Sequence, residues 1–332
     1  MRIGLAGVGR IGAGHAETLR GLGAVEEVVL ADADPVRARR VADKLGVRAV
    51  GAVEDLFTAG LDALVVAAPT AAHAALVTRA VAADLPVFCE KPLAADLDGT
   101  VQLMAEIAGA GVPVQVGFQR RFDPGHIAAR DAVRSGSLGW VHTVRSCTLD
   151  PAPPPAEYLP TSGGLFRDCS VHDFDAVRFV TGREVVRVTA TGANRGDAFF
   201  AEAGDIDTGA AMLTLDDGTI ALVSAARYNA AGYDVRLEVL GSRDSVVAGL
   251  DDRTPVTPAG PGLRPAGPPH TGFLERFAEA YAAELRAFVE VAAGRAGNPC
   301  PPGDCLEALY VAEAAEVSRT ENRPVDIEEV RR

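Results

Sequence analysis

The sequence lacks any run of eighteen apolar residues, which argues against a membrane-spanning helix. It also lacks an excess of basic residues: the formal net charge is -13, which disfavours a nucleic acid as partner. That charge is typical of a solvated acidic surface. Met1-Arg2 leads directly into an apolar, strand-like run, which leaves no room for a secretory signal. We therefore expect a cytoplasmic protein whose partners include neither nucleic acid nor membrane.

Cysteine is sparse and shows no paired pattern. The five cysteines are odd in number and scattered, which argues against a disulfide framework. Cys300 and Cys305 come nearest to a metal-binding pair, but their spacing does not fit a zinc knuckle and no second Cys or His pair accompanies them. We therefore expect no metal site.

The length of 332 residues fits two domains, each with a core of its own. In residues 1–118, short apolar runs alternate with helix-like stretches such as 72–83 and 96–110. The expected strands of this part are Arg2–Ala6, Glu27–Ala31, Ala63–Ala67, Pro86–Cys89 and Val112–Val116. This alternation indicates βαβ units, so residues 1–118 are predicted to form an α/β Rossmann domain with a parallel sheet.

Residues 119–332 follow a different pattern. Period-two apolar runs joined by turn signals predict strands at 141–149, 185–191, 208–215, 220–226 and 235–240. Helices are expected at 123–135, 170–181, 273–293 and 304–318, and Pro-rich loops at 150–155 and 258–269. These elements predict an α+β domain on an open, mostly antiparallel sheet, for substrate binding and oligomerisation. They leave open whether the C-terminal helices pack back on the first domain.

A glycine-rich turn follows the first expected strand. The segment Gly7-Val8-Gly9-Arg10-Ile11-Gly12 has the spacing G-x-G-x-x-G and leads into a helical stretch. In such a turn the glycines allow a tight bend, close approach of a pyrophosphate and close packing of helix on strand. A glycine triplet alone is weak evidence, but Asp32 ends the second strand at the spacing expected of a ribose-binding carboxylate. Gly7, Gly9, Arg10, Ile11, Gly12 and Asp32 are therefore the candidate dinucleotide-binding residues.

The same carboxylate bears on the choice of cofactor. A negative charge at Asp32 would repel the 2′-phosphate of NADP, so we expect NAD. Arg37, Arg39 and Arg40 could instead reach a phosphate. Their pattern is more typical of an exposed helix face.

Two further segments carry a family resemblance. Glu90-Lys91-Pro92 resembles the Glu-Lys-Pro signature of the Gfo/Idh/MocA oxidoreductases. Residues 162–175 resemble the catalytic helix segment of the myo-inositol dehydrogenase branch of that family. The resemblance extends over nearly the whole chain, and it is more specific for the family than for one substrate.

The resemblance implies a role for three residues in catalysis. Lys91 is expected near the nicotinamide and the reacting hydroxyl, and Asp168 with His172 forms the family's catalytic Asp-x-x-x-His pair. Histidine suits proton transfer because its pKa lies near the operating pH. On a helix, residues four apart share one face, so the carboxylate could orient the imidazole, while Lys91 would favour a developing alkoxide. The cofactor itself carries the redox chemistry.

The resemblance also implies binding roles. Cofactor contacts are implied for Pro69, Thr70, His73, Glu90 and Lys91. Substrate contacts are implied for Lys91, Arg121, Asp168, His172, Tyr233 and Tyr281. Two departures from the branch stand out: Leu149 replaces an Arg that commonly precedes the Pro-rich run, and Cys169 replaces a Met. The first puts the identity of the substrate in doubt, and the second is a plausible packing change.

Simpler interpretations exist for single residues. His172 alone could be a helix-face histidine, Asp168 a helix N-cap and Lys91 a loop lysine. Asp175 and Arg178, three apart on one expected helix, are typical of an ordinary ion pair at the surface or between domains.

The functions that fit these features fall into three classes. The first is NAD-dependent oxidation of a secondary hydroxyl of myo-inositol, a related inositol or a pyranose, with a homodimer or homotetramer formed through the C-terminal sheet. The second is lyase or hydrolase chemistry on the same scaffold through a transient keto-sugar. The third is a non-catalytic NAD-binding regulator, against which the joint presence of Lys91, Asp168 and His172 speaks.

Overall fold

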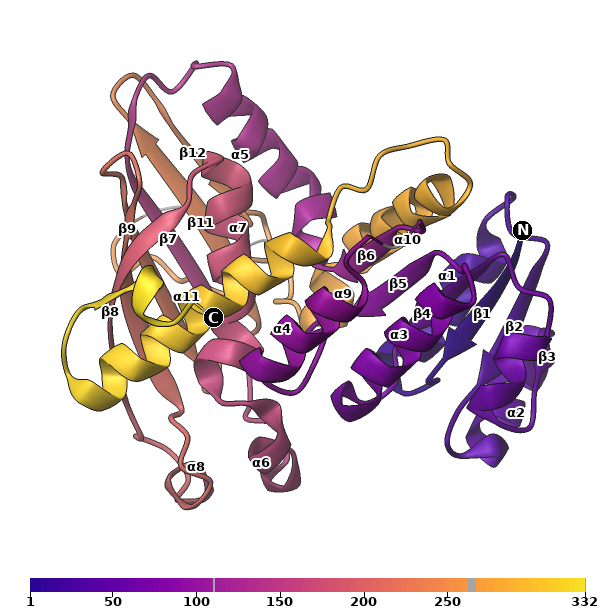
Figure 1. The fold of residues 1–332 in the computed structure, drawn as a ribbon. Helices are drawn as coiled ribbons and strands as arrows, with labels where there is room; N and C mark the ends of the chain where they lie inside the picture. The colour runs from indigo at the N-terminus through magenta and orange to yellow at the C-terminus, as the bar shows by residue number, and fades with distance from the viewer. Residues whose placement is uncertain (110, 262–266, 332) are drawn as a thin grey trace. The chain divides into compact units, whose positions relative to one another are not determined.

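A computed structural model describes residues 1–109, 111–261 and 267–331. The chain divides into two compact units, whose elements Figure 1 labels. The first unit comprises residues 1–119 and 279–306, and the second comprises residues 120–278 and 307–332. The polypeptide therefore enters the first unit twice, so its core is built from both ends of the sequence.

The first unit contains a six-stranded parallel sheet in the order β3-β2-β1-β4-β5-β6. Its strands are β1 (Arg2–Ala6), β2 (Glu27–Ala31), β3 (Arg48–Ala49), β4 (Ala63–Val66), β5 (Val87–Glu90) and β6 (Val114–Gly117). Its helices include α1 (Arg10–Gly21), α2 (Pro35–Leu45), α3 (His73–Ala82), α4 (Leu97–Glu106) and α10 (Ala278–Ala292). The parallel sheet and its helices confirm the predicted Rossmann architecture.

Local sequence accounts for these elements. The strands are continuous apolar runs because both faces of a parallel sheet are covered by helices. The start of α2 is marked by Pro35 and by Asp34, whose side chain accepts hydrogen bonds from two backbone N–H groups of the first turn. Buried side chains of α1, α2 and α10 share one core with the sheet, and α3 and α4 cover the opposite face (Figure 1). Leu285, Phe288 and Val289 are the contribution of α10 to that core.

The second unit is built on a seven-stranded sheet in the order β12-β11-β7-β10-β9-β8-β13. Its strands are β7 (Val141–Leu149), β8 (Val185–Ala193), β9 (Thr208–Leu215), β10 (Ile220–Ala226), β11 (Asp234–Gly241), β12 (Ser245–Ala248) and β13 (Val325–Asp326). Neighbours are antiparallel except β7 and β10, which run parallel. The mostly antiparallel sheet was predicted, whereas the short edge strands β12 and β13 were not.

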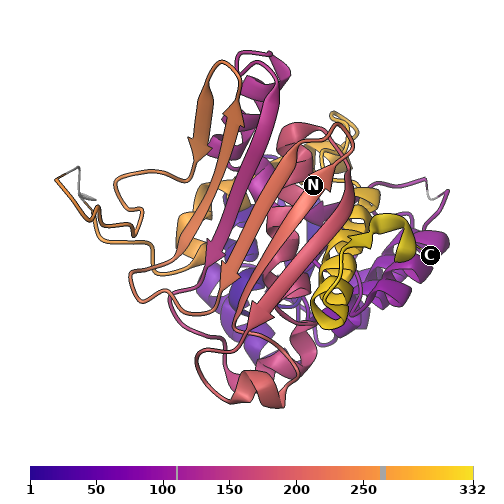
Figure 2. The ribbon, with the colours of Figure 1, turned by 90° about the vertical axis from the view of Figure 1, so that its left-hand side faces the viewer.

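Helices cover one face of this sheet. They include α5 (Pro124–Arg134) and α7 (Val171–Thr181), and Figure 2 shows them behind the strands. Shorter helices are α6 (Leu159–Ser162), α8 (Phe199–Glu202) and α9 (Phe273–Arg276), while α11 (Pro302–Glu321) begins in the first unit and ends in the second. On the opposite face Met212, Ile220 and Leu222 are between 42% and 44% exposed. One face of the sheet thus keeps apolar side chains in contact with solvent.

Two predicted helices differ from the structure. The stretch 273–293 is not one helix, because α9 ends at Arg276 and α10 starts at Ala278. The intervening Phe277 is fully buried and lies beneath the Arg276 guanidinium, so its side chain is anchored where the chain leaves the second unit. The helix expected from residue 170 is preceded by a π-helical stretch, Phe166–Ser170. Part of the expected loop at 258–269 lies outside the described residues.

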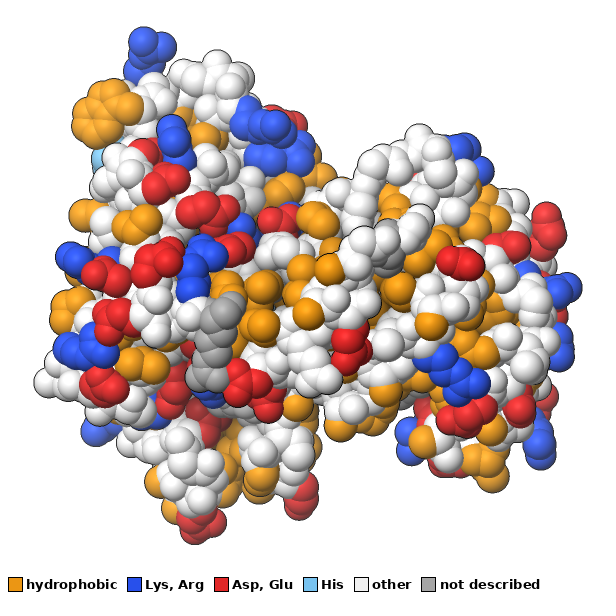
Figure 3. Space-filling view, viewed as in Figure 1, with side chains coloured by type: hydrophobic (Ala, Val, Ile, Leu, Met, Phe, Trp, Pro, Cys, Tyr) orange, Lys and Arg blue, Asp and Glu red, His pale blue; other side chains and the backbone are white. Residues whose placement is uncertain are grey.

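The surface agrees with the composition. None of the described helices is both long and apolar enough to cross a membrane. On the face that Figure 3 presents, acidic and basic side chains are interspersed, with no large patch of one sign. All five cysteines lie in the described part of the chain and are thiols, as the scattered pattern predicted.

Candidate active site

The turn between β1 and α1 is shaped by glycines. Gly7 has φ +95°, and a Cβ there would lie 2.5 Å from the backbone of Ala68. A Cβ on Gly12 would lie 1.9 Å from the carbonyl oxygen of Gly7. A Cβ on Gly9, by contrast, would meet no described atom within 4 Å. Gly7 and Gly12 are therefore needed for packing within the protein, and Gly9 leaves space for a ligand, as the predicted pyrophosphate contact requires.

The start of α1 is suited to an anion. Its N-cap is Gly9, and no side chain caps the helix there. The first N–H groups of a helix need acceptors, and a phosphate can supply them. Arg10 and Ile11, the first two residues of α1, lie at this position.

Asp32 lies beside the same turn. Its carboxylate accepts hydrogen bonds from the backbone N–H of Val8 (2.8 Å) and of Asp34 (2.9 Å), and it is 7% exposed. These bonds hold the carboxylate at the carboxyl end of β2, where a dinucleotide's ribose binds in this fold. The Arg37 guanidinium lies 3.5 Å from Asp32, so this residue is a neighbour of the carboxylate as well as part of an exposed helix face.

The carboxyl ends of β4 and β5 carry the next group of predicted residues. Pro69 and Thr70 lie at the short 3-10 helix (Thr70–Ala72) that follows β4. His73 is 2% exposed, and its two ring nitrogens lie 2.7 Å from the carbonyl oxygens of Pro92 and Ala68. Both ring nitrogens of His73 thus face backbone carbonyl oxygens, and a neutral imidazole donates to one of the two. His73 thereby connects the loops that follow β4 and β5, and its predicted contact with the cofactor stays a prediction.

Glu90 and Lys91 come at the end of β5. The Glu90 carboxylate is 2.6 Å from Nε2 of His15, a residue of α1 for which no motif predicts a role. The ring of Tyr281, from α10, lies 5.8 Å from that of His15. Lys91 is half-buried, and the peptide bond between it and Pro92 is cis.

In the second unit, Asp168 is held from two sides. Its Oδ1 accepts a hydrogen bond from the hydroxyl of Tyr158 (2.9 Å), and its Oδ2 accepts one from the guanidinium of Arg227 (2.7 Å). Ser170 is the N-cap of α7, which excludes that role for Asp168. His172 is the second residue of α7 and is half-buried. Asp168 lies in the π-helical stretch, where each turn holds more residues than in an α-helix. The angle between Asp168 and His172 around the helix axis therefore differs from that of residues four apart on a regular α-helix.

Arg227 is a site residue that the sequence analysis missed. Its guanidinium donates to Asp168 and also to Asp150 (2.9 Å), and its side chain is 6% exposed. Burial raises the pKa of Asp150, whereas the Arg227 charge lowers it. Burial opposes the charge on Arg227 as well, yet the neighbouring acidic groups raise the pKa of its guanidinium. The available signal was an arginine directly after β10, a strand of alternating burial, but no motif tied it to Asp150 or Asp168.

The other predicted substrate contacts in this unit are buried. Arg121 is 8% exposed and donates hydrogen bonds of 3.2 Å, 2.9 Å and 2.6 Å to the Asp175 carboxylate. Arg178 pairs with Glu184, so the surface ion pair predicted between Asp175 and Arg178 was wrong: both residues are buried and have partners elsewhere. Arg121 thus forms a buried ion pair with Asp175, and its predicted contact with the substrate stays a prediction.

Tyr233 completes this set of buried side chains. It is 5% exposed, and burial raises the pKa of its hydroxyl. The nearby charged groups are Arg120, Asp150 and Asp173.

Comparison with known proteins decides the family. A model of the oxidoreductase family with an NAD-binding Rossmann fold matches residues 1–118, and the model of the GFO/IDH/MocA C-terminal domain matches residues 126–247. The chain belongs to the Gfo/Idh/MocA oxidoreductase family. Its first unit therefore carries the NAD-binding Rossmann domain of this family, and the open space at Gly9 fits that cofactor.

Several family members are similar over their full length. A myo-inositol dehydrogenase of Streptomyces leeuwenhoekii is 43% identical, with 96% of this chain and 98% of the relative covered. An inositol 2-dehydrogenase of Rhizobium meliloti is 39% identical, with 98% and 99% covered. The crystal structure of a scyllo-inositol dehydrogenase from Lactobacillus casei, with bound NAD(H) and scyllo-inositol, has a TM-score of 0.89 at 31% identity and 99% coverage of both chains.

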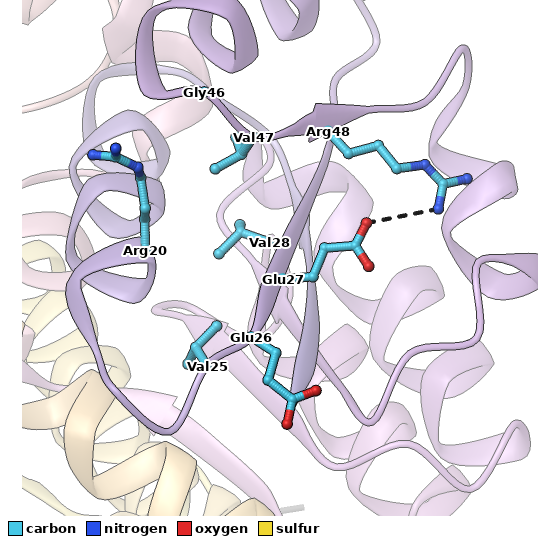
Figure 4. Close-up of a pocket in the computed structure, with 8 residues that line it drawn as sticks. All are labelled: Arg20, Val25, Glu26, Glu27, Val28, Gly46, Val47 and Arg48. Carbon is cyan, nitrogen blue, oxygen red and sulfur yellow. Dashed lines mark ion pairs between the residues drawn. The ribbon is translucent and has the colours of Figure 1, made fainter.

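A separate hollow in the first unit is not part of this site. It is lined by residues at the start of β2 and by neighbouring segments, among them Arg20, Glu27 and Arg48 (Figure 4). Asp32 follows the opposite end of β2. Ligands of open parallel sheets bind at the carboxyl ends of the strands, so this hollow does not belong to the dinucleotide site.

The close contact at Gly12 predicts a large difference between two substitutions on α1. Gly12→Ala should lower the free energy of unfolding by about 1–3 kcal/mol, because its methyl group would overlap the Gly7 carbonyl. Gly14→Ala is the matched control: a Cβ there meets no described atom within 4 Å, so it should raise stability by about 0.5–1 kcal/mol. Urea unfolding of the two variants measures both effects. Equal midpoints would contradict the packing role of Gly12.

The position of Arg227 predicts a second stability effect. Arg227→Met should destabilise the protein by about 3–5 kcal/mol, because it leaves two mostly buried carboxylates, 21% and 13% exposed, without their cation. Arg145→Met, which removes an exposed pair with Glu238, should cost at most about 1 kcal/mol. Adding Asp150→Asn to Arg227→Met should restore part of the loss, since it removes one of the two like charges. The account of this cluster is wrong if Arg227→Met and Arg145→Met unfold at the same urea concentration.

Proposed function

We propose that this chain is an inositol 2-dehydrogenase, which oxidises a secondary ring hydroxyl of an inositol with NAD. The observation that carries the proposal is the Asp168 carboxylate, fixed by Tyr158 and Arg227 four residues before His172, in a chain whose first unit binds NAD. Relatives named as inositol dehydrogenases support the choice of substrate class, as does the similar structure that contains scyllo-inositol and NAD(H).

The proposed roles follow from the chemistry of each side chain. NAD, when bound, supplies the hydride acceptor. His172 takes the hydroxyl proton, and the ionised Asp168 stabilises the resulting imidazolium. The ammonium of Lys91 favours the developing alkoxide on the substrate. With both oxygens already engaged by Tyr158 and Arg227, the Asp168 carboxylate has little freedom to rotate, so its charge stays in a fixed position.

The same site favours NAD over NADP. The Asp32 carboxylate is held at the ribose position by two backbone N–H groups, and its charge would repel a 2′-phosphate there. The Arg37 guanidinium lies 3.5 Å from the Asp32 carboxylate, so its positive charge is paired with Asp32.

A spectrophotometric screen tests the proposed activity. Myo-inositol, scyllo-inositol and aldopyranoses are offered with NAD or with NADP, and NADH formation is followed together with product analysis. We expect NADH in stoichiometric amount with at least one inositol, and a clear preference for NAD. Conversion of substrate without net NADH would contradict the proposal and indicate chemistry through a transient keto-sugar. NAD binding without turnover of any polyol would indicate a regulator.

His172 is the residue whose removal tests the proposed mechanism. His172→Ala should lower turnover of the active inositol by roughly 10²–10⁴ and leave the affinity for NAD nearly unchanged, because only the proton acceptor is lost. His142→Ala removes an exposed histidine of β7 and serves as the control, with no expected effect. Unchanged turnover in His172→Ala would remove this residue from the mechanism.

We also propose that the chain forms a homodimer or homotetramer through the uncovered face of the second unit's sheet. Met212 and Leu222 are paired on adjacent strands there and are 44% and 43% exposed. The double variant Met212→Lys/Leu222→Lys should lower the molecular mass in solution, because it places two like charges in an apolar interface. Val36→Lys alters an exposed valine of α2 and should leave the mass unchanged. A wild-type protein that is monomeric by light scattering would rule the proposal out.

A further inference from the structure

Three titratable side chains meet in the interior of the first unit. They are His15 from α1, Glu90 from the end of β5 and Glu284 from α10, and they are 2%, 7% and 0% exposed. One polar atom from each lies within 4.8 Å of the other two. The rings of Phe88 and Tyr281 lie within 5.8 Å of the His15 ring. Nothing in the sequence motifs or in the proposed chemistry uses Glu284.

This cluster has more hydrogen-bond acceptors than donors. His15 and Glu90 satisfy each other through the 2.6 Å contact, but neither carboxylate oxygen of Glu284 has a donor among the described residues. Gln115, on β6, donates its amide N–H to the backbone carbonyl of Glu284 (3.1 Å), and its own Oε1 is also without a described donor. A buried acceptor without a donor is costly, and a buried unpaired charge is far more so.

Protonation of Glu284 removes the buried charge and turns one of its two oxygens into a donor. Burial raises the pKa of Glu284 well above its ordinary value, and the neighbouring Glu90 carboxylate raises it further. A neutral carboxylic acid carries no charge and has one O–H to donate. The other titratable groups of the cluster are His15 from α1 and Glu90 from β5, and the ring of Tyr281 lies 5.8 Å from that of His15.

A metal ion is the alternative source of positive charge, and the geometry disfavours it. Zinc bonds to histidine nitrogen and carboxylate oxygen are about 2.0–2.2 Å long, so neighbouring ligands of a tetrahedral site lie about 3.3 Å apart. His15 Nε2 and Glu90 Oε1 are separated by only 2.6 Å. That distance is a hydrogen bond between the two side chains, as in a charge-assisted pair.

We infer that Glu284 is a positioning residue, which keeps its proton and shares it with Glu90. Glu90 is then held on one side by His15 and on the other by Glu284. It is the last residue of β5, and Lys91 follows it directly. The three side chains together therefore fix the backbone from which Lys91 reaches the substrate. The catalytic consequence of this inference rests on the proposed role of Lys91. The shared proton rests on the cluster alone.

Two substitutions of Glu284 separate the shared proton from mere space filling. Glu284→Gln keeps the shape and an N–H donor but cannot ionise, so turnover and KM should stay within about twofold of wild type. Glu284→Leu has a similar volume and no donor, so Glu90 loses one of its two partners. Turnover should fall by up to roughly 10², with a smaller change in KM, because the reacting group is displaced by up to about 1 Å. Glu279→Leu, an exposed glutamate on the same helix, is the control.

A second measurement does not depend on activity. Infrared difference spectra of wild type against Glu284→Gln should show the C=O stretch of a protonated carboxylic acid at neutral pH, and the band should be absent in the variant. Metal analysis of the purified protein should find no stoichiometric ion. The inference is overturned if Glu284→Gln loses activity as Glu284→Leu does, if the band is missing from wild type, or if an ion is bound and lost in Glu284→Gln. If no inositol is oxidised but the band behaves as expected, the proposed function fails and the shared proton stands.

Discussion

Two backbone segments of the first unit approach so closely that no side chain fits between them. The carbonyl of Gly7 occupies the place where a Cβ of Gly12 would lie, and Gly7 itself packs against the loop after β4. This contact fixes where α1 begins and how it lies on β1. Val8, within the turn, donates its N–H to Asp32, and His15, one turn after Gly12, reaches Glu90. This one close contact therefore helps to set the positions of the nucleotide loop, of the Asp32 carboxylate and of the cluster of His15 with Glu90.

The second unit depends on a different constraint, which is the pairing of buried charge. Arg120, Arg121 and Arg227 are each less than 9% exposed, and each donates to a carboxylate. Such pairs add little net stability, but the loss of one partner is expensive because the other charge remains buried. Each pairing therefore leaves its carboxylate with one favourable position. Asp168, which the sequence analysis found through a motif, is likewise held in one position by its hydrogen bonds with Tyr158 and Arg227.

The sequence predicted what depends on local pattern. The bounds of β1, β2, β7, β9 and β10 agree with the expected runs, because alternation and apolar composition are local properties. The glycine turn and Asp32 were also found, since their spacing is set by one βαβ unit. The family motifs located Lys91, Asp168 and His172 along the chain.

Contacts that join distant segments could not be predicted. Asp175 and Arg178 have the spacing of a helical pair, but Asp175 pairs with Arg121, fifty-four residues away in the sequence. Glu284 stands in an ordinary amphipathic helix, and only the return of residues 279–306 to the first unit brings it to His15 and Glu90. Arg227 and Phe277 likewise acquire their roles from partners elsewhere in the chain. In each case, the periodic pattern of the sequence predicts which face of the element is buried. It does not predict which residue of another element contacts that face.

Direct hydride transfer from the ring carbon to NAD can be followed with a labelled substrate. An inositol that carries deuterium on the carbon bearing the reacting hydroxyl is incubated with the protein and NAD, and the reduced cofactor is examined by mass spectrometry. We expect the deuterium to be recovered in the NADH, one per molecule of ketone formed. Ketone formation with unlabelled NADH, or loss of the label to water, would contradict direct hydride transfer between the ring carbon and the nicotinamide.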